Sequence, residues 1–141
     1  MEQILALVGL LSCLMMSTAV ESAKCNLEGQ WKNDLGSNMT ISSVDSNGQF
    51  AGTYLTAVSV TNKTIVKSPL IGFQQEKDSP TFGFTVKWKF SDSITVFAGQ
   101  CFISETGQPI LQAIWLLRSE SDDIKDNWKQ TRVGNNIFQP M

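Results

Sequence analysis

The sequence predicts an all-β protein whose eight antiparallel strands close into an up-and-down barrel. Apolar and polar residues alternate through nearly every segment after residue 24, as in strands with one dry face, and no segment keeps a helical period for long. Tight turns separate the segments, and closing many short strands into a barrel removes the exposed edges of the sheet. A two-sheet sandwich is the alternative architecture.

The first half of the barrel is expected to contain four strands. A turn at Asp45–Gly48, with glycine where a positive φ is needed, separates the second strand from the third. The expected strands are Gly29–Asn33, Asn38–Val44, Gln49–Ala57 and Thr64–Phe73.

Four further strands follow, and the fifth is unusual because its apolar parity carries bulky aromatic side chains and then runs into a group of hydroxyls. A second glycine turn is expected at Ser104–Gly107, and one helical turn is expected at Asp122–Lys125. The expected strands are Thr81–Phe90, Ile94–Ile103, Ile110–Arg118 and Trp128–Phe138. An eight-stranded barrel is of the size that either fills with side chains or holds one small ligand.

The amino terminus has the order of a secretory signal peptide. An apolar run at Leu5–Met16, too short to span a membrane, is followed by the small residues Ser17, Thr18 and Ala19. We expect cleavage before Lys24, so that residues 1–23 form the signal peptide and residues 24–141 form the barrel domain.

Removal of the signal peptide changes the charge and the cysteine count. Two of the 13 acidic residues leave, and 13 − 2 = 11 acidic residues then balance 11 basic ones, which argues against a nucleic-acid or membrane-surface partner. Cys13 also leaves, so Cys25 and Cys101 have only each other in an oxidising compartment, and we expect a disulfide between them. Asn38 and Asn62 each begin a glycosylation sequon.

Catalysis has little support in the sequence. The absence of histidine excludes histidine-based triads and most zinc sites, and no free thiol remains after disulfide formation. The carboxylates lie mainly at turns and strand ends, and no glycine-rich phosphate loop is present. We therefore expect a protein that is not an enzyme and that has no metal and no cofactor.

A small-molecule pocket fits the composition better than an active site. Four tryptophans are many for so small a domain, and hydroxyl and amide side chains lie within or beside the strands. An aromatic wall with a few convergent polar groups is how small-molecule sites are generally built. A lipocalin-like carrier of another apolar ligand is the alternative, although dense hydroxyls would be wasted on a lipid.

Long blocks of the sequence resemble the avidin family of biotin-binding proteins. The blocks cover essentially the whole mature chain in order: Cys25–Thr40, which reads CNLEGQWKNDLGSNMT, Gly52–Val58, Phe82–Phe102, Trp115–Arg118 and Asp126–Gly134. The resemblance implies an eight-stranded barrel that binds biotin at one end and assembles as a homotetramer.

The resemblance also implies a role for each residue of a biotin site. The donors to the ureido oxygen would be Asn33, Ser37 and Tyr54, and the acceptors from the ureido N–H groups would be Thr56 and Asn136. Thr95 would meet the ring sulfur. The valeryl carboxylate would be held by Ser59, Thr61, Ser91 and Ser93, with backbone N–H groups near Val60. The bicyclic ring would be boxed by Trp88, Phe90, Phe97 and Trp115 and lined by Leu35, Val58 and Leu117. Trp128 would reach into the pocket of a neighbouring subunit as a lid.

Two further expectations concern structure rather than ligand contacts. Arg132 is expected to stack over the indole of Trp31 at the closed end of the barrel. At one subunit contact the family pattern has three apolar residues, which fall here on Ile114, Val133 and Asn135, and the last of these is polar. An amide in that position has to find a partner or weaken the contact.

Overall fold

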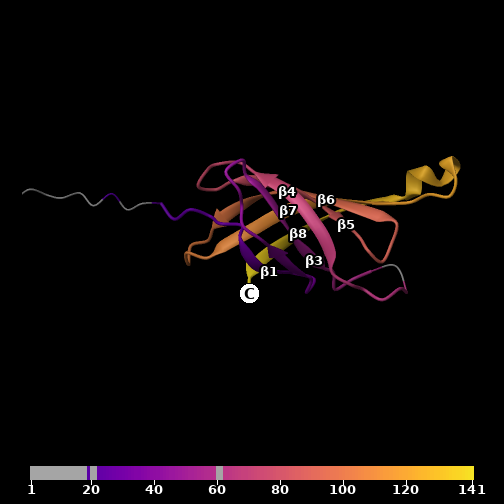
Figure 1. Ribbon diagram of the computed structural model, residues 1–141, viewed down its shortest axis with the longest axis horizontal. Coiled ribbons are helices and arrows are strands. Elements are labelled where there is room, and N and C mark those ends of the chain that lie inside the picture. Colours follow the sequence, from indigo (N-terminus) through magenta and orange to yellow (C-terminus); the bar gives the residue numbers. More distant parts are fainter. Residues whose placement is uncertain (1–18, 20–21, 60–61) are drawn as a thin grey trace, which may run out of the picture.

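The computed structural model describes residue 19 and residues 22–59 and 62–141 of the 141-residue chain, and it confirms the predicted closed barrel (Figure 1). Eight antiparallel strands follow one another around the barrel in chain order, and the eighth closes against the first. The strands are β1 (Gly29–Asn33), β2 (Asn38–Ile41), β3 (Gln49–Leu55), β4 (Ser68–Gln74), β5 (Thr81–Lys87), β6 (Ser93–Ile103), β7 (Pro109–Ser119) and β8 (Thr131–Pro140). The expected signal peptide lies outside the described residues apart from positions 19, 22 and 23.

Several strands are shorter than the alternation predicted. β2 ends at Ile41 rather than Val44, β3 ends at Leu55 rather than Ala57, and β4 begins at Ser68 rather than Thr64. β5 ends at Lys87, yet Trp88 and Phe90 beyond it remain buried. Their side chains keep the inward parity after the backbone pairing has stopped, which is why the sequence pattern overran the strand.

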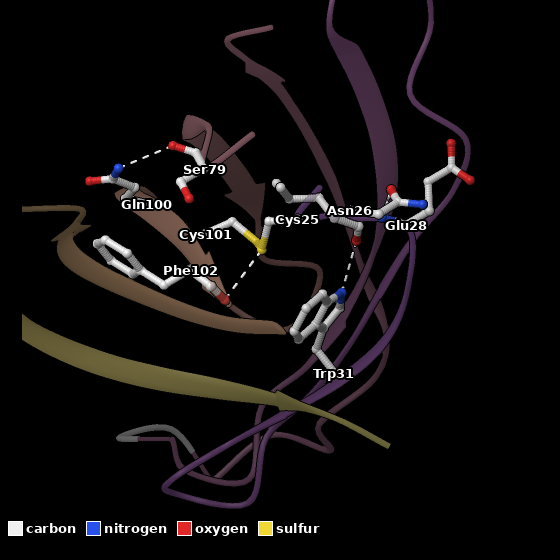
Figure 2. The surroundings of a disulfide bond; sticks show 9 residues. Cys25, Asn26, Glu28, Trp31, Ser79, Gln100, Cys101 and Phe102 are labelled. Atoms are coloured by element: carbon white, nitrogen blue, oxygen red, sulfur yellow. Dashed lines mark hydrogen bonds between the residues drawn. A yellow bond between two sulfur atoms is a disulfide. The ribbon is translucent and has the colours of Figure 1, made fainter. Parts of the chain in front are cut away.

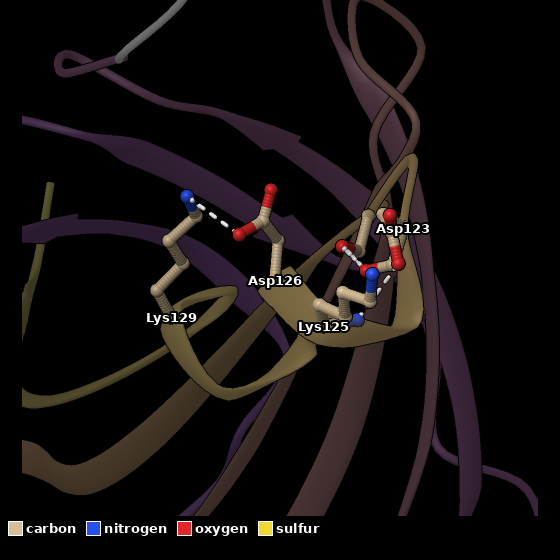
Figure 3. A network of polar contacts seen from close by, with 5 residues as sticks. Asp123, Lys125, Asp126 and Lys129 are labelled. Carbon is tan, nitrogen blue, oxygen red and sulfur yellow. Dashed lines mark hydrogen bonds and ion pairs between the residues drawn. The ribbon is translucent and has the colours of Figure 1, made fainter.

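The prediction that the last strand begins at Trp128 is wrong, because Trp128 belongs to a 3₁₀ helix, η1 (Ile124–Lys129), and β8 begins at Thr131. The side chain of Asp123 accepts a hydrogen bond of 2.9 Å from the backbone N–H of Lys125 and so caps the helix. An ion pair of 3.0 Å joins Asp126 to Lys129 one turn later (Figure 3). These local polar contacts form the helical turn a few residues later than the predicted Asp122–Lys125.

One end of the barrel is filled by its own side chains. Trp31, Phe50, Leu111 and Phe138 are almost completely buried there, and the indole Nε1 of Trp31 donates to the carbonyl of Leu27 at 2.8 Å (Figure 2). This packed apolar end fixes the barrel's cross-section, and the cavity inside the barrel lies at the opposite end.

The expected stacking of Arg132 over Trp31 is wrong. In the β1–β8 register Trp31 lies opposite Pro140, eight residues beyond Arg132 along β8. Eight residues of strand span roughly 26 Å, so the two side chains belong to opposite ends of the barrel. Arg132 is exposed and lies opposite Leu117 on β7.

The predicted disulfide between Cys25 and Cys101 is confirmed (Figure 2). It joins the segment before β1 to β6 across a sequence separation of 76 residues, and both cysteines are buried. The backbone N–H of Cys25 donates to the carbonyl of Asp78, and that of Cys101 donates to the carbonyl of Pro80. The cross-link therefore ties the amino-terminal segment, the β4–β5 connection and β6 together.

The seam between β1 and β8 is short. Its register includes only Trp31, Lys32 and Asn33 on β1, whereas β7 pairs with β8 from Leu111 to Arg118. The seam is also the one place where the ladder of the barrel joins strands that do not follow each other in the chain.

The outer surface over β4, β6, β7 and β8 carries exposed apolar side chains. Val96, Leu116 and Val133 lie directly across from one another on β6, β7 and β8, and Ile114 lies opposite Asn135. We call the following residues the outer apolar face: Ile71, Phe73, Ile94, Val96, Ile114, Leu116, Val133 and Ile137. In the described part of the chain, none of the helices has the length and apolar character that crossing a bilayer requires.

Candidate functional site

The end of the barrel opposite the packed core holds a cavity of about 450 Å³. Strand ends and the loops after β1, β3 and β5 surround it. It brings together most of the predicted site residues, which are Asn33, Ser37, Tyr54, Thr56, Ser59, Trp88, Phe90, Ser91, Ser93, Thr95, Phe97, Trp115 and Asn136. The expected lining residues Leu35, Val58 and Leu117 are present as well.

Three of the predicted site residues remain to be placed. Val60 and Thr61 lie outside the described residues. Trp128 does not line the cavity of its own chain, because η1 projects beyond the barrel and leaves the indole 80% exposed (Figure 1).

The floor of the cavity is a cluster of polar side chains on an apolar base. Asn33, Ser37 and Tyr54 are all buried, and the amide Nδ2 of Asn33 donates to the hydroxyl of Tyr54 at 3.1 Å. The ring of Tyr54 stacks on Phe97 with centroids 5.6 Å apart and meets the edge of Trp88 at 5.5 Å. Together with an edge contact to Phe138 at 6.3 Å, this packing on three sides holds the Tyr54 hydroxyl in place before any ligand arrives.

The orientation of the Asn33 amide is fixed by the loop that follows β1. Its Oδ1 accepts from the backbone N–H groups of Leu35 at 3.0 Å and Ser37 at 2.8 Å. The loop can fold back in this way because Gly36 adopts a φ of +87°. Since Oδ1 is engaged, Nδ2 is the atom that faces the floor, where it is a donor.

The hydroxyls of Ser37 and Tyr54 are also set up as donors. Ser37 Oγ accepts from the backbone N–H of Ala57 at 2.9 Å, which leaves its own O–H to donate. Burial raises the pKa of Tyr54 well above its ordinary value, against smaller lowering contributions from hydrogen bonds with Ser37 and Asn33. Tyr54 therefore keeps its proton wherever the protein is folded near neutral pH.

Asn136 is oriented by a residue that the sequence did not nominate for the site. Its Nδ2 donates to Oδ1 of Asp34 at 2.8 Å, and the backbone N–H of Ile137 donates to the same oxygen at 3.3 Å. A carboxylate can only accept, so Asp34 selects the donor side of the amide, and the acceptor Oδ1 of Asn136 points the other way. Asn136 is buried and lines the cavity, where it presents an acceptor close to the cluster of donors.

The aromatic walls carry a hydrogen bond of their own. Trp88 Nε1 donates to Thr95 Oγ1 at 2.8 Å, and both side chains are buried. The bond fixes the plane of the indole and directs the hydroxyl proton of Thr95 elsewhere. Phe90 packs on Trp88 at a centroid distance of 5.5 Å, and Trp115 completes the wall from β7. Rigid aromatic faces lose little entropy when a flat apolar ligand binds between them.

The mouth of the cavity is polar and partly charged. The Ser91 and Ser93 hydroxyls are hydrogen-bonded to each other, and Thr56 Oγ1 donates to the carbonyl of Val58 at 2.7 Å. The mouth also contains charged and polar side chains that sequence reasoning missed, namely Asp92, Ser119, Glu120 and Arg132. The end of a strand gives no sequence signal of which side chains will lean over a cavity.

The cavity can therefore bind a small molecule with an oxygen that accepts several hydrogen bonds, a flat apolar body and a polar outer end. Among the described residues no group of three or more histidine, cysteine or acidic side chains is placed to hold a metal ion. The sequon residues lie outside the cavity: Asn38 is half-buried at the start of β2, and Asn62 is exposed.

Comparisons with known proteins agree with the architecture. Residues 21–141 match the model of the avidin family. The chain is 55% identical to avidin of Gallus gallus over 137 residues, which are 95% of this chain and 90% of that protein. The crystal structure of Xenavidin covers 84% of this chain and 99% of its own, with 59% identity and a TM-score of 0.82. A structure titled as a biotin binding protein from chicken covers 84% and 98%, with 56% identity and a TM-score of 0.81.

Proposed function

The chain belongs to the avidin family, and from this premise we propose that it is a secreted, non-catalytic protein that binds biotin tightly and so sequesters or stores it. Biotin is a fused bicycle with a cyclic urea on one side, a sulfur in the other ring and a valeric acid chain. We propose a matching group in the cavity for each of these parts.

The observation that carries the proposal is the convergence of three oriented donors on one apolar-walled floor. Asn33 Nδ2, the Ser37 hydroxyl and the protonated Tyr54 hydroxyl can each act as a donor, and all three residues line the cavity. Three donors on one urea oxygen favour negative charge on that oxygen, as in an oxyanion hole but with no reaction following. The acceptor side of Asn136 then suits an N–H of the same urea.

The remainder of the ligand would occupy the aromatic box and the mouth. The wall formed by Trp88, Phe97 and Trp115 would desolvate the bicycle, and the hydroxyl of Thr95 would meet the ring sulfur. At the mouth, Ser59, Ser91 and Ser93 would hold the carboxylate. Because the groups are positioned before binding, little ordering cost is left to weaken the complex.

A titration of tryptophan fluorescence tests the function. Biotin should quench the emission and reach saturation at one molecule per chain, because Trp88 and Trp115 line the cavity. Excess fatty acid should leave bound biotin in place, whereas a lipocalin-like carrier would exchange it. Weak, non-saturating quenching by biotin would contradict the proposal.

We further propose a homotetramer in which the outer apolar face is covered by other copies of this chain. Monomeric proteins rarely expose an apolar patch as extended as the one over β4, β6, β7 and β8. A second copy suits it because the face is uncharged at Ile114, Leu116 and Val133. Asn135 beside Ile114 adds one amide that must be hydrated or paired in the contact. Light scattering after size exclusion should give four chains per particle.

Trp128 is the residue that would join assembly to binding. Its indole is exposed on a helix that projects past the cavity end of the barrel, as expected of a side chain completed by a neighbouring subunit (Figure 1). We expect Trp128→Lys to release biotin at least about tenfold faster and to weaken the tetramer, since interface tryptophans commonly contribute 2 kcal/mol or more.

The matched control for this prediction is Ile124→Lys, which adds the same charge to an exposed apolar position of η1. That variant should keep the wild-type dissociation rate. An unchanged rate in a Trp128→Lys protein that is still tetrameric would contradict the role of Trp128 as a lid.

Export from the cell is supported by the disulfide and by the composition of residues 1–23. A buried disulfide persists in oxidising compartments and is rare where thiols are kept reduced. Glycans at Asn38 and Asn62 belong to the same proposal. Mass spectrometry of secreted protein from a eukaryotic host would give both the new amino terminus, expected at Lys24, and the glycan occupancy.

A further inference from the structure

Gly134 on β8 lies directly opposite Trp115 on β7. Both positions have the inward parity of their strands, since Asn136 and Phe138 on β8 and Leu111 and Ala113 on β7 are buried. Arg132 and Asn136, two residues before and after the glycine, line the cavity, whereas Gly134 itself does not. The indole of Trp115 covers the glycine, so Trp115 rather than Gly134 forms this part of the cavity wall.

There is no room for a side chain beneath the indole. A Cβ atom added to Gly134 would lie 2.3 Å from Cζ2, 2.7 Å from Cε2 and 2.9 Å from Cη2 of Trp115. Real Cβ contacts essentially never fall below 3.0 Å, and a fused ring cannot bend aside as a flexible chain end can. The ring as a whole would have to move, and the open space beside it is the cavity that Trp115 lines.

Gly134 differs in this respect from the other tightly packed strand glycines. A Cβ at Gly52, Gly72 or Gly99 would collide first with a backbone carbonyl oxygen of the neighbouring strand, so these glycines serve the sheet itself. All three nearest atoms at Gly134 belong to one side chain of the cavity wall. Its φ is not in the left-handed range, so the backbone there would accept alanine without strain.

We propose that Gly134 is a positioning residue of the ligand site: its missing side chain sets the place of the Trp115 indole, and thereby the width of the cavity. Because biotin is the ligand in the test below, this proposal rests on the function proposed above. A methyl group at position 134 would tilt the indole into the volume of the bicyclic ring. In this variant, cyclic ureas with a narrower ring system should lose less affinity than biotin does.

The test is a cycle of variants at the two positions. Gly134→Ala should weaken biotin roughly tenfold to a hundredfold, the range expected when a packed site is overfilled by a methyl group. In a Trp115→Phe background, where the ring is smaller, the same change should cost less than about threefold, because the collision is relieved. Gly83→Ala is the matched control, since its Cβ would meet only a backbone oxygen at 3.3 Å, away from the cavity.

Readouts without ligand separate this proposal from the proposed function. The ligand-free Gly134→Ala protein should show a changed near-ultraviolet circular dichroism signal and, in a crystal, a rotated Trp115, whether or not the wild type binds biotin. A wild type that ignores biotin would overturn the function, while the rotated indole would still support the positioning role. If Gly134→Ala does not fold, the double variant with Trp115→Phe should restore folding.

Two results would overturn the positioning role. One is an unmoved Trp115 with unchanged biotin affinity in Gly134→Ala. The other is an equal loss of affinity, or of folding, in the wild-type and Trp115→Phe backgrounds, because a purely structural glycine would act regardless of the size of the ring opposite it.

Discussion

A Tyr54→Phe protein should bind biotin roughly 30- to 900-fold more weakly than the wild type, a loss of about 2–4 kcal/mol. The change removes one of the three donors on the cavity floor, and it also leaves the amide Nδ2 of Asn33 without its buried partner. A hydrogen bond to a partly charged oxygen is stronger than an ordinary one, and an unpaired buried donor adds a desolvation cost. Isothermal titration, or competition with a labelled biotin where binding is too tight, gives the two affinities.

Thr53→Val is the matched control, because it deletes one hydroxyl from an exposed, outward-facing position on the same strand. Its affinity should equal that of the wild type. Tyr54→Phe should also keep most of its thermal stability, since the ring and its contacts with Phe97 and Trp88 remain. Equal affinity in the Tyr54→Phe and wild-type proteins would rule out the three-donor floor.

The protonation of Tyr54 gives this prediction a pH signature. A free tyrosine loses its proton near pH 10, and burial moves the pKa of Tyr54 upward from there. The neutral donor therefore persists in the folded protein through the range in which an exposed tyrosine ionises. Biotin affinity should be flat from pH 7 to about pH 9.5, and a decline within that range that is absent from Tyr54→Phe would mean that the hydroxyl ionises earlier than its burial requires.

Removal of the disulfide is the second change with a large expected effect. The variant Cys25→Ala/Cys101→Ala should lose about 4 kcal/mol of folding free energy, because a cross-link over so long a loop restricts the unfolded chain strongly. A loss of that size should lower the unfolding midpoint by more than about 10 °C. Guanidinium unfolding measures the free energy and thermal unfolding the midpoint temperature, both on ligand-free protein at one fixed protein concentration.

Reduced wild-type protein is the internal control and should unfold together with the double variant. Neither cysteine lines the cavity, so the folded variant should bind biotin with wild-type affinity. Equal unfolding midpoints for the oxidised wild type and the variant would show that the cross-link has no part in stability. A large loss of affinity in the folded variant would show instead that the two ends of the barrel are coupled.

Alternation predicted most of the strands, because one face of each strand lies on the interior, and the turns together with the removal of sheet edges favoured a barrel over a sandwich. It failed at the strand ends around the cavity. Trp88 and Phe90 keep their inward parity after the backbone has left the sheet, so a pattern of side chains could not reveal where pairing stops. The predicted strand start at Trp128 failed for a different reason, since capping by Asp123 is a local contact with no periodic signature.

Hydroxyl and amide side chains within or beside the strands indicated a pocket from the sequence, but their separate roles came only from the family resemblance, and their partners could not be predicted at all. Asp34 resembled any loop carboxylate in the sequence, and its role depends on β1 and β8 being neighbours across 102 positions. Arg132 was assigned to the wrong end because the register of β8 against β1 is not encoded locally. The role of Gly134 could not be predicted for a similar reason, since it depends on the Trp115 indole on the neighbouring strand.

The brief seam where the first and last strands meet has a mechanical consequence. The paired stretch of three residues is flanked by backbone hydrogen bonds from Asp34 to Ile137 and from Met141 to Gln30, and it ends beside Asn33 on β1 and Asn136 on β8. A urea ring bound by both amides would link β1 to β8 across this short paired stretch. Bound ligand would then stabilise the folded state by its affinity, and it would also oppose local separation of β1 from β8.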